Sequence, residues 1–240
     1  MDITLINPPE KLRVWAGIPK AHAHGVYCFP PLGLMYIQAA VEKRSGYKAE
    51  ICDPVVDDLD YPDFEQMLRR YPLDLVGIST YTHSLPDVQM TIDLVRKINP
   101  NAKIVLGGPH CAMFPDYSIQ LKGIDAMVTG DGEDAFLEMS KRYDAGKDWS
   151  GIAGLWWKDT DGTVIKNTER ASTKDLTAYP WPDRSRSRYK DTTCRAPSSP
   201  WSPRPSRAGA APTAARSASP TKSSTASARS TTFSTRWSTA

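Results

Sequence analysis

Cysteine is scarce in this sequence, and no long apolar run occurs. The 240 residues include 4 cysteines, Cys28, Cys52, Cys111 and Cys194, which are widely spaced and form no C-x-x-C pair. This spacing argues against a disulfide framework and a structural zinc site, so we expect reduced, buried thiols. No stretch reaches about 18 apolar residues, which excludes a membrane span. The first residues, MDITLINPPEK, lack the basic and apolar regions of a signal peptide, so a cytoplasmic protein is expected.

Leu, Ile, Val and Met are absent after Leu176, and the charge changes sign nearby. Up to Asp183 the chain holds 19 basic and 26 acidic residues, a net charge of −7, whereas residues 184–240 hold 11 basic residues and one acid, a net charge of +10. A tail rich in Ser, Thr, Ala, Arg and Pro buries too little apolar surface to offset the entropy lost on ordering. The sequence therefore predicts a folded region up to residue 183 and a disordered tail over 184–240.

Short β-rich runs alternate with helical periodicity through the first ~150 residues, the pattern of a parallel α/β sheet. The expected strands are 3–6, 49–52, 75–78, 103–106 and 126–129. The expected helices are one that follows Pro31 and ends at Gly46, one over 64–70, one that follows Ser84 and one that begins near Phe136. Ser84 and Asp87 have the spacing of a capping box. Five βα steps predict a doubly wound, five-stranded parallel sheet.

Doubly wound sheets bind ligands beyond the carboxyl ends of their strands, so the loops at those ends are the candidate site. Glycine there lets a ligand approach the backbone, and hydroxyl groups supply hydrogen bonds. Strand-to-helix turns also use Gly and Pro without any ligand, and Glu133 fits a helix cap as well as a ligand contact. The candidates are Asn7, Pro8, Ser79, Thr80, Tyr81, Gly107, Gly108, Pro109, His110, Gly130, Asp131, Gly132 and Glu133.

Several common sites do not match these loops. No G-x-G-x-x-G follows the first strand, which weakens a nicotinamide Rossmann interpretation, and no P-loop motif occurs. A phosphoacceptor site needs clustered carboxylates where Asn7 and Ser79 lie. Two interpretations stay open for His22, His24 and Cys28: a metal site, or a loop near a cofactor. The segment has no second carboxylate or cysteine at helical spacing, which favours the loop.

The motifs LINPP, PPLGL, GISTYT, VLGGPH and GDGE occur in this order at βα spacing. In this respect the chain resembles the N-terminal cobalamin-binding domain of B12-dependent radical SAM enzymes, which include methyltransferases and the anaerobic magnesium-protoporphyrin monomethyl ester cyclase type. The resemblance implies a flavodoxin-like or Rossmann-like domain over 1–148, then a β-hairpin and a connector over 149–183 that leads toward a radical SAM barrel. It also adds three candidates from PPLGL, namely Pro31, Leu32 and Gly33.

The resemblance implies cobalamin as the cofactor. Gly107, Gly108 and the glycines at 130 and 132 would leave room for the corrin tail, and Ser79 and Thr80 would donate hydrogen bonds. The cobalt-ligating D-x-H-x-x-G signature of other cobalamin proteins is absent, so His110 is not assigned as a cobalt ligand. A noncatalytic α/β module that binds another nucleotide-like ligand is the alternative.

The tail lacks the C-x-x-x-C-x-x-C loop that binds a [4Fe–4S] cluster and S-adenosylmethionine in radical SAM enzymes. We therefore expect the chain to be inactive alone, and its substrate stays unknown because the barrel would choose it. Over 208–218 the neighbouring reading frame permits SRGCPYRCTFC, with cysteines in place of Ala211, Ala215 and Ala218. We hypothesise a frameshift, real or from sequencing, between about Arg184 and Pro200, which the nucleotide sequence would decide. The less favoured alternative is a natural basic arm that binds nucleic acid.

Overall fold

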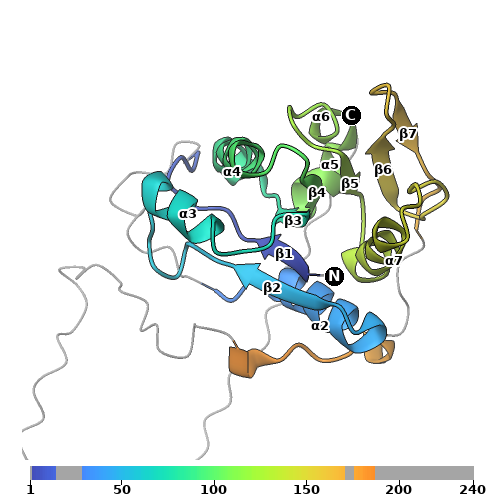
Figure 1. Cartoon of the computed structure of the whole chain (residues 1–240), viewed down its shortest axis with the longest axis horizontal. Helices are drawn as coiled ribbons and strands as arrows, with labels where there is room; N and C mark the ends of the chain where they lie inside the picture. The colour runs from blue at the N-terminus through green and yellow to red at the C-terminus, as the bar shows by residue number, and fades with distance from the viewer. Residues whose placement is uncertain (1, 15–28, 171–175, 187–240) are drawn as a thin grey trace, which may run out of the picture. The chain divides into compact units, whose positions relative to one another are not determined.

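The computed structural model describes residues 2–14, 29–170 and 176–186 (Figure 1). These residues belong to one compact unit that spans Met1–Ser199. His22, His24, Cys28, Cys194 and nearly all of the expected tail lie outside the described ranges, so the predictions made for them stay predictions. Arg184–Arg186, the first residues of the expected tail, form a short 3-10 helix, η3.

A seven-stranded sheet forms the centre of the structure, in the order β2-β1-β3-β4-β5-β6-β7. The first five strands are parallel, as predicted, because each is followed by a helical crossover to the next. The hairpin strands pair antiparallel to β5 and to each other, so the expected separate hairpin is an extension of this sheet. The strands are β1 (Asp2–Ile6), β2 (Lys48–Cys52), β3 (Leu75–Ser79), β4 (Lys103–Gly107), β5 (Ala126–Val128), β6 (Leu155–Lys158) and β7 (Val164–Lys166).

Helices cover both faces of the sheet (Figure 1). On one face, α3 and α4 bury Phe64, Val88 and Ile92 against the strands. On the other, α2 and α7 bury Val41 and Phe136. Strands buried on both faces read as continuous apolar runs, which is why the sequence predicted them well. The helices are α2 (Leu32–Ser45), α3 (Tyr61–Leu68), α4 (Leu85–Ile98), α5 (Pro109–Met113), α6 (Pro115–Ser118) and α7 (Gly132–Asp144), with short 3-10 turns η1 (Thr82–Ser84) and η2 (Leu176–Ala178).

The helix ends confirm one local prediction and correct another. Gly46 ends α2 in the left-handed conformation, and its N–H donates to Glu42 O at 3.1 Å. The predicted capping box of Ser84 and Asp87 is wrong, because Ser84 Oγ donates to Tyr81 O and makes no cap bond. The Asp87 carboxylate instead accepts hydrogen bonds from the loop after β1. Asp87 thus bonds to a distant loop and not to Ser84 in its own helix end.

The edge strand β2 has its backbone groups occupied by side chains. Gln38 Nε2 donates to Ala49 O at 2.7 Å, and Ala49 N–H donates to Glu42 Oε1 at 3.3 Å. Arg186 reaches the same region, with both Glu42 carboxylate oxygens within 2.9 Å of its Nη1. Arg186, in the first residues of the expected tail, is therefore fastened to α2 and β2.

Two further expectations concern thiols and membranes. Cys52 and Cys111 are buried free thiols, as predicted, and burial raises the pKa of the Cys111 thiol to about 11. Within residues 2–14, 29–170 and 176–186, none of the helices has the length and apolarity that a bilayer crossing requires.

Candidate functional site

The order of the strands places a topological switch point between β1 and β3. From β1 the chain moves outward to β2 on one side and then to β3 on the other, so the crossovers diverge there. Ligands of doubly wound sheets bind in the crevice at such a point, outside the carboxyl ends of the strands. The predicted residues after β1, β3, β4 and β5 lie at this carboxyl edge.

The loops after β3 and β4 are joined through Thr80. Its N–H donates to Gly107 O at 2.7 Å, and its carbonyl accepts from His110 N–H at 3.2 Å. Gly108 lies between them with φ 107°, and a Cβ there would come within 2.9 Å of Thr80 O, so a side chain does not fit. Thr80 itself is fully buried, with its hydroxyl donating to Ile78 O. Thr80 thus joins the two loops through its main chain and is itself buried, whereas the sequence predicted that it contacts a ligand directly.

His110 carries the least satisfied polar atom of these loops. Its side chain is 3% exposed, and its Nδ1 lies 2.9 Å from Thr82 Oγ1. Its Nε2 is buried and has no hydrogen-bond partner, a condition it shares, among the described residues, with Trp157 Nε1 in β6. Burial lowers the pKa of His110, which favours the neutral imidazole. A buried polar atom without a partner costs about 1–3 kcal/mol, and a ligand that supplies the partner recovers this cost.

Open space surrounds three of the predicted glycines. A Cβ placed on Gly33, Gly107 or Gly130 would meet no atom within 4 Å, so the backbone is accessible there. Gly132 is different, because a Cβ would lie 3.0 Å from Ile37 Cδ1 in α2. The missing side chain of Gly132 therefore allows α2 and α7 to pack together, and the other three glycines leave room for a ligand.

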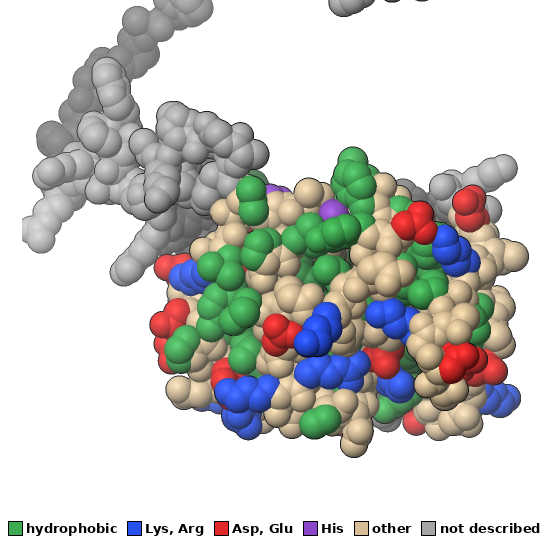
Figure 2. All heavy atoms as spheres, turned by 90° about the horizontal axis from the view of Figure 1, so that it is seen from above, with side chains coloured by type: hydrophobic (Ala, Val, Ile, Leu, Met, Phe, Trp, Pro, Cys, Tyr) green, Lys and Arg blue, Asp and Glu red, His purple; other side chains and the backbone are tan. Residues whose placement is uncertain are grey.

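Large apolar side chains are exposed on the segments around the crevice. Figure 2 shows apolar side chains next to histidine atoms in the upper part of that view. Extended apolar exposure of this kind marks a binding surface on a protein that is otherwise well buried. The exposed side chains on these segments are Leu12, Val14, Phe29, Leu32, Tyr81, Met113, Phe114 and Tyr117, from 44% for Leu32 to 71% for Phe29.

The remaining predicted residues have mixed surroundings. Asn7 Nδ2 donates to Asp53 Oδ1 at 3.0 Å, and Pro8 is buried, so both stabilise the loop after β1. Asp131 is exposed just before α7, and Glu133 lies in the first turn of that helix. Burial raises the pKa of Glu133, which favours its protonated form relative to an ordinary glutamate. Ser79 and Pro109 complete the edge, at the end of β3 and the start of α5.

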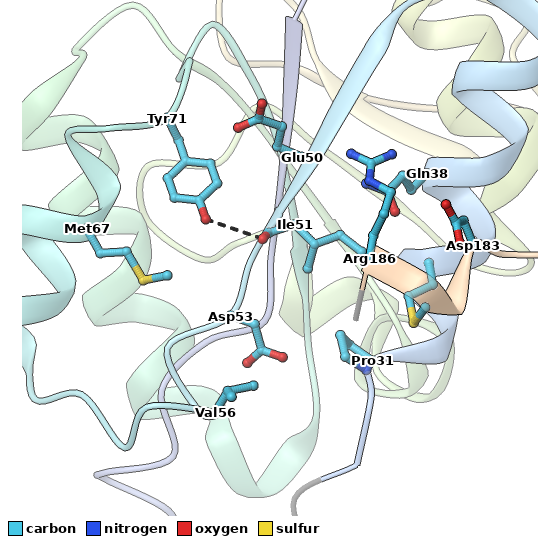
Figure 3. Close-up of a pocket in the computed structure, with 11 residues that line it drawn as sticks. Pro31, Gln38, Glu50, Ile51, Asp53, Val56, Met67, Tyr71, Asp183 and Arg186 are labelled. Carbon is cyan, nitrogen blue, oxygen red and sulfur yellow. Dashed lines mark hydrogen bonds between the residues drawn. The ribbon is translucent and has the colours of Figure 1, made fainter. Parts of the chain in front are cut away.

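A pocket of about 230 Å³ lies beside β2, and its lining residue Asp53 accepts the hydrogen bond from Asn7 of the loop after β1. Side chains from α2, β2, α3 and the connector surround it, and Tyr71 donates to Ile51 O across one wall (Figure 3). Of the predicted site residues only Pro31 lines it. Sequence reasoning missed this pocket because Asp183, at the end of the connector, and Arg186, in the expected tail, lie far from α2 in the sequence.

Metal-ligating side chains do not gather in the described part of the chain, where no group of three His, Cys, Asp or Glu residues could hold an ion. The open glycines, the exposed apolar side chains and the unpaired His110 Nε2 suit a large, flat, partly apolar molecule with polar edges.

Comparison with known proteins identifies such a cofactor. Residues 21–140 match the B12 binding domain family. The chain is 31% identical over 183 residues to the uncharacterized methyltransferase PH0819 of Pyrococcus horikoshii, covering 76% of this chain and 38% of that protein. It is 27% identical over 173 residues to the anaerobic magnesium-protoporphyrin IX monomethyl ester cyclase of Rubrivivax gelatinosus, covering 69% of this chain and 31% of the cyclase.

A solved structure has the same fold. It is the radical S-adenosylmethionine methyltransferase TsrM from Kitasatospora setae, with cobalamin and a [4Fe-4S] cluster bound, and it aligns with a TM-score of 0.57 at 20% identity. The alignment covers 75% of this chain and 31% of TsrM. The chain thus spans about a third of the length of the proteins it matches.

Proposed function

Since the chain belongs to the B12-binding domain family, we propose that it serves as the cobalamin-binding part of a B12-dependent radical SAM enzyme. The observation that carries the proposal is the unpaired, buried Nε2 of His110, set among open glycines at the carboxyl edge of the sheet. Among the described residues, no side chain supplies a partner for this atom, and a polar group of a bound corrin would supply one.

Each group at the edge has a defined task in this proposal. Gly33, Gly107 and Gly130 let the cofactor approach the backbone, and Tyr81, Phe114 and other exposed apolar side chains cover its flat surface. His110 makes a hydrogen bond through Nε2. If the Thr82 hydroxyl donates to Nδ1, Nε2 carries the proton and donates; if Nδ1 donates to Thr82, Nε2 accepts. Ser79, Asp131 and Glu133 are further polar contacts, and Thr80 fixes the loops. Bound cobalamin supplies a cobalt centre that carries a methyl group or assists radical chemistry.

The activity of the whole enzyme is a separate proposal. Its relatives are longer, so we place a radical SAM barrel, with its [4Fe–4S] cluster and S-adenosylmethionine, after the connector over 149–183. Methyl transfer or a radical cyclisation would be the reaction. The sequence as given has no cluster-binding cysteine motif, so we expect it to bind cobalamin and to catalyse nothing alone. The buried free thiols of Cys52 and Cys111 suit a reducing, cytoplasmic location.

The test is retention of the corrin by the purified chain. After incubation with hydroxocobalamin and gel filtration, we expect corrin absorbance to elute with the protein. The variant Gly107→Ala adds a methyl group into open space, so its thermal midpoint should match the wild type while its affinity for hydroxocobalamin falls about tenfold, or ~1.4 kcal/mol. A protein that elutes colourless contradicts the proposal, and retention of a flavin or nicotinamide nucleotide instead would favour the alternative α/β module.

A further inference from the structure

The loop after β1 is fastened to the start of α4 by a buried carboxylate. Asp87 is fully buried, and its Oδ1 accepts from Lys11 N–H and Leu12 N–H, each at 3.0 Å. Its Oδ2 lies 3.1 Å from the same Leu12 nitrogen. The hydroxyl of Tyr61, at the start of α3, also donates to Oδ1. One carboxylate thus joins three segments that are distant in the sequence.

A second set of contacts holds the same loop. Val14 N–H donates to His83 O at 2.8 Å, and Glu10 Oε1 lies 3.8 Å from His83 Nε2. Lys11 Nζ donates to Asp58 O at 2.7 Å. The loops after β1 and β3, which flank the switch point, are therefore bound to each other along the side of α3 and α4.

Burying a carboxylate is costly unless it is fully hydrogen-bonded, so the position of Asp87 needs a reason. Helix capping is not the reason, since the carboxylate binds main-chain N–H groups of another loop. What it holds in place is apolar surface, because Leu12 is 47% and Val14 is 55% exposed beside the switch point. The hydrogen bonds stabilise the loop, but the Leu12 and Val14 side chains remain largely exposed, so their fixed position adds little buried apolar area to the core.

We propose that Asp87 is a positioning residue for the cofactor, which holds Leu12 and Val14 as one apolar wall of the cobalamin site. This inference rests on the proposed function and adds Asp87, Leu12 and Val14, which the sequence motifs did not indicate. Cobalamin then meets a wall that is already in place, and binding does not have to pay the entropy of ordering the loop.

The experiment compares Asp87→Asn with Asp125→Asn. Asp125 is a matched control, because its carboxylate also accepts a main-chain N–H, from Ile104 at 2.8 Å, but it lies before β5, at the amino ends of the strands. Both variants should lower the thermal midpoint. Only Asp87→Asn should weaken hydroxocobalamin binding, about tenfold, and speed amide hydrogen exchange in the peptide 7–14, while Asp125→Asn stays within about twofold of the wild-type Kd.

A second variant covers the case in which Asp87→Asn does not fold. The double substitution Leu12→Ser with Val14→Ser changes exposed side chains, so the fold should persist while affinity again falls about tenfold. Wild-type affinity in this double variant, or equal losses in Asp87→Asn and Asp125→Asn, would overturn the inference and leave the proposed function standing. A wild-type chain that binds no corrin would overturn both.

Discussion

The two ends of the sheet differ in how far their polar groups are satisfied. At the amino ends, Asp125 accepts from Arg96, Lys103 and Ile104 N–H, with distances from 2.6 to 3.2 Å. Arg96 also donates to the carbonyl oxygens of Gly123, Pro100 and Ala102. At the carboxyl ends, His110 Nε2 has no partner within the part of the chain that the structure describes, and Gly107 and Gly130 face open space.

This difference separates residues that hold the fold from residues that await a ligand. A network whose donors and acceptors are all paired gains nothing from a further molecule, whereas an unpaired buried atom does. Mutations at the amino ends should therefore change stability and leave binding alone. Mutations at the carboxyl ends should change binding, and those that distort the joined loops should change both.

The largest effect is expected for Gly108→Ala. Its φ of 107° disfavours any side chain, and the added Cβ would lie 2.9 Å from Thr80 O. We expect a loss of about 2–3 kcal/mol in the free energy of unfolding, since strained backbone and a displaced loop both contribute. Cobalamin binding should fall below detection, because the bonds from Thr80 to Gly107 and His110 would break. Urea unfolding and corrin retention measure the two effects.

Gly107→Ala is the control for that prediction, since the neighbouring position has free space and no positive φ. Its unfolding free energy should stay within about 0.5 kcal/mol of the wild type. Equal destabilisation by the two substitutions would contradict the assignment of Gly108 as the point of close approach.

The next effect is expected for Arg96→Ala at the amino ends. The substitution leaves three carbonyl oxygens and the Asp125 carboxylate without this donor, which should cost about 1–3 kcal/mol. The Kd for hydroxocobalamin should remain within about twofold of wild type, measured by titration at a temperature where the variant is folded. A large loss of affinity would show that the two ends of the sheet are coupled, and would contradict the separation of stabilising residues from ligand-binding residues.

The smallest effect is the pH dependence due to His110. Its pKa in the folded protein is lowered by burial, so the unfolded chain takes up a proton first as the pH falls. The free energy of unfolding should therefore decrease as the pH drops below about 6.5 and level off below the folded pKa. His110→Gln should reduce this slope. Part of it should remain, because burial also lowers the pKa of His83.

Local sequence patterns predicted the regular elements of this fold well. The apolar runs at Leu75 and Lys103 became central strands, and Gly46 ended α2, because each depends on neighbours in the sequence. The candidate loops at the carboxyl edge were also identified, since strand order in a doubly wound sheet places them together.

Long-range contacts were not predictable in this way. Asp87 has the spacing of a capping residue, yet its partners Lys11 and Tyr61 lie on other elements. Thr80 reads as a hydroxyl donor in an open loop, and only the pairing of β3 with β4 shows that it is buried. The hairpin could be foreseen, but its pairing with β5 and the contact of Trp157 with Trp149 join segments whose proximity local patterns do not encode.

The occupied backbone of β2 has a consequence for the behaviour of the domain in concentrated solution. Exposed sheet edges template pairing between chains and lead to aggregation. At one edge, Gln38, Glu42 and Tyr71 already use hydrogen-bonding groups of β2. At the other, β7 has only three residues and ends in Lys166, a charge that opposes strand addition. Both margins of the sheet are thus poor templates for the addition of a strand from a second copy of this domain.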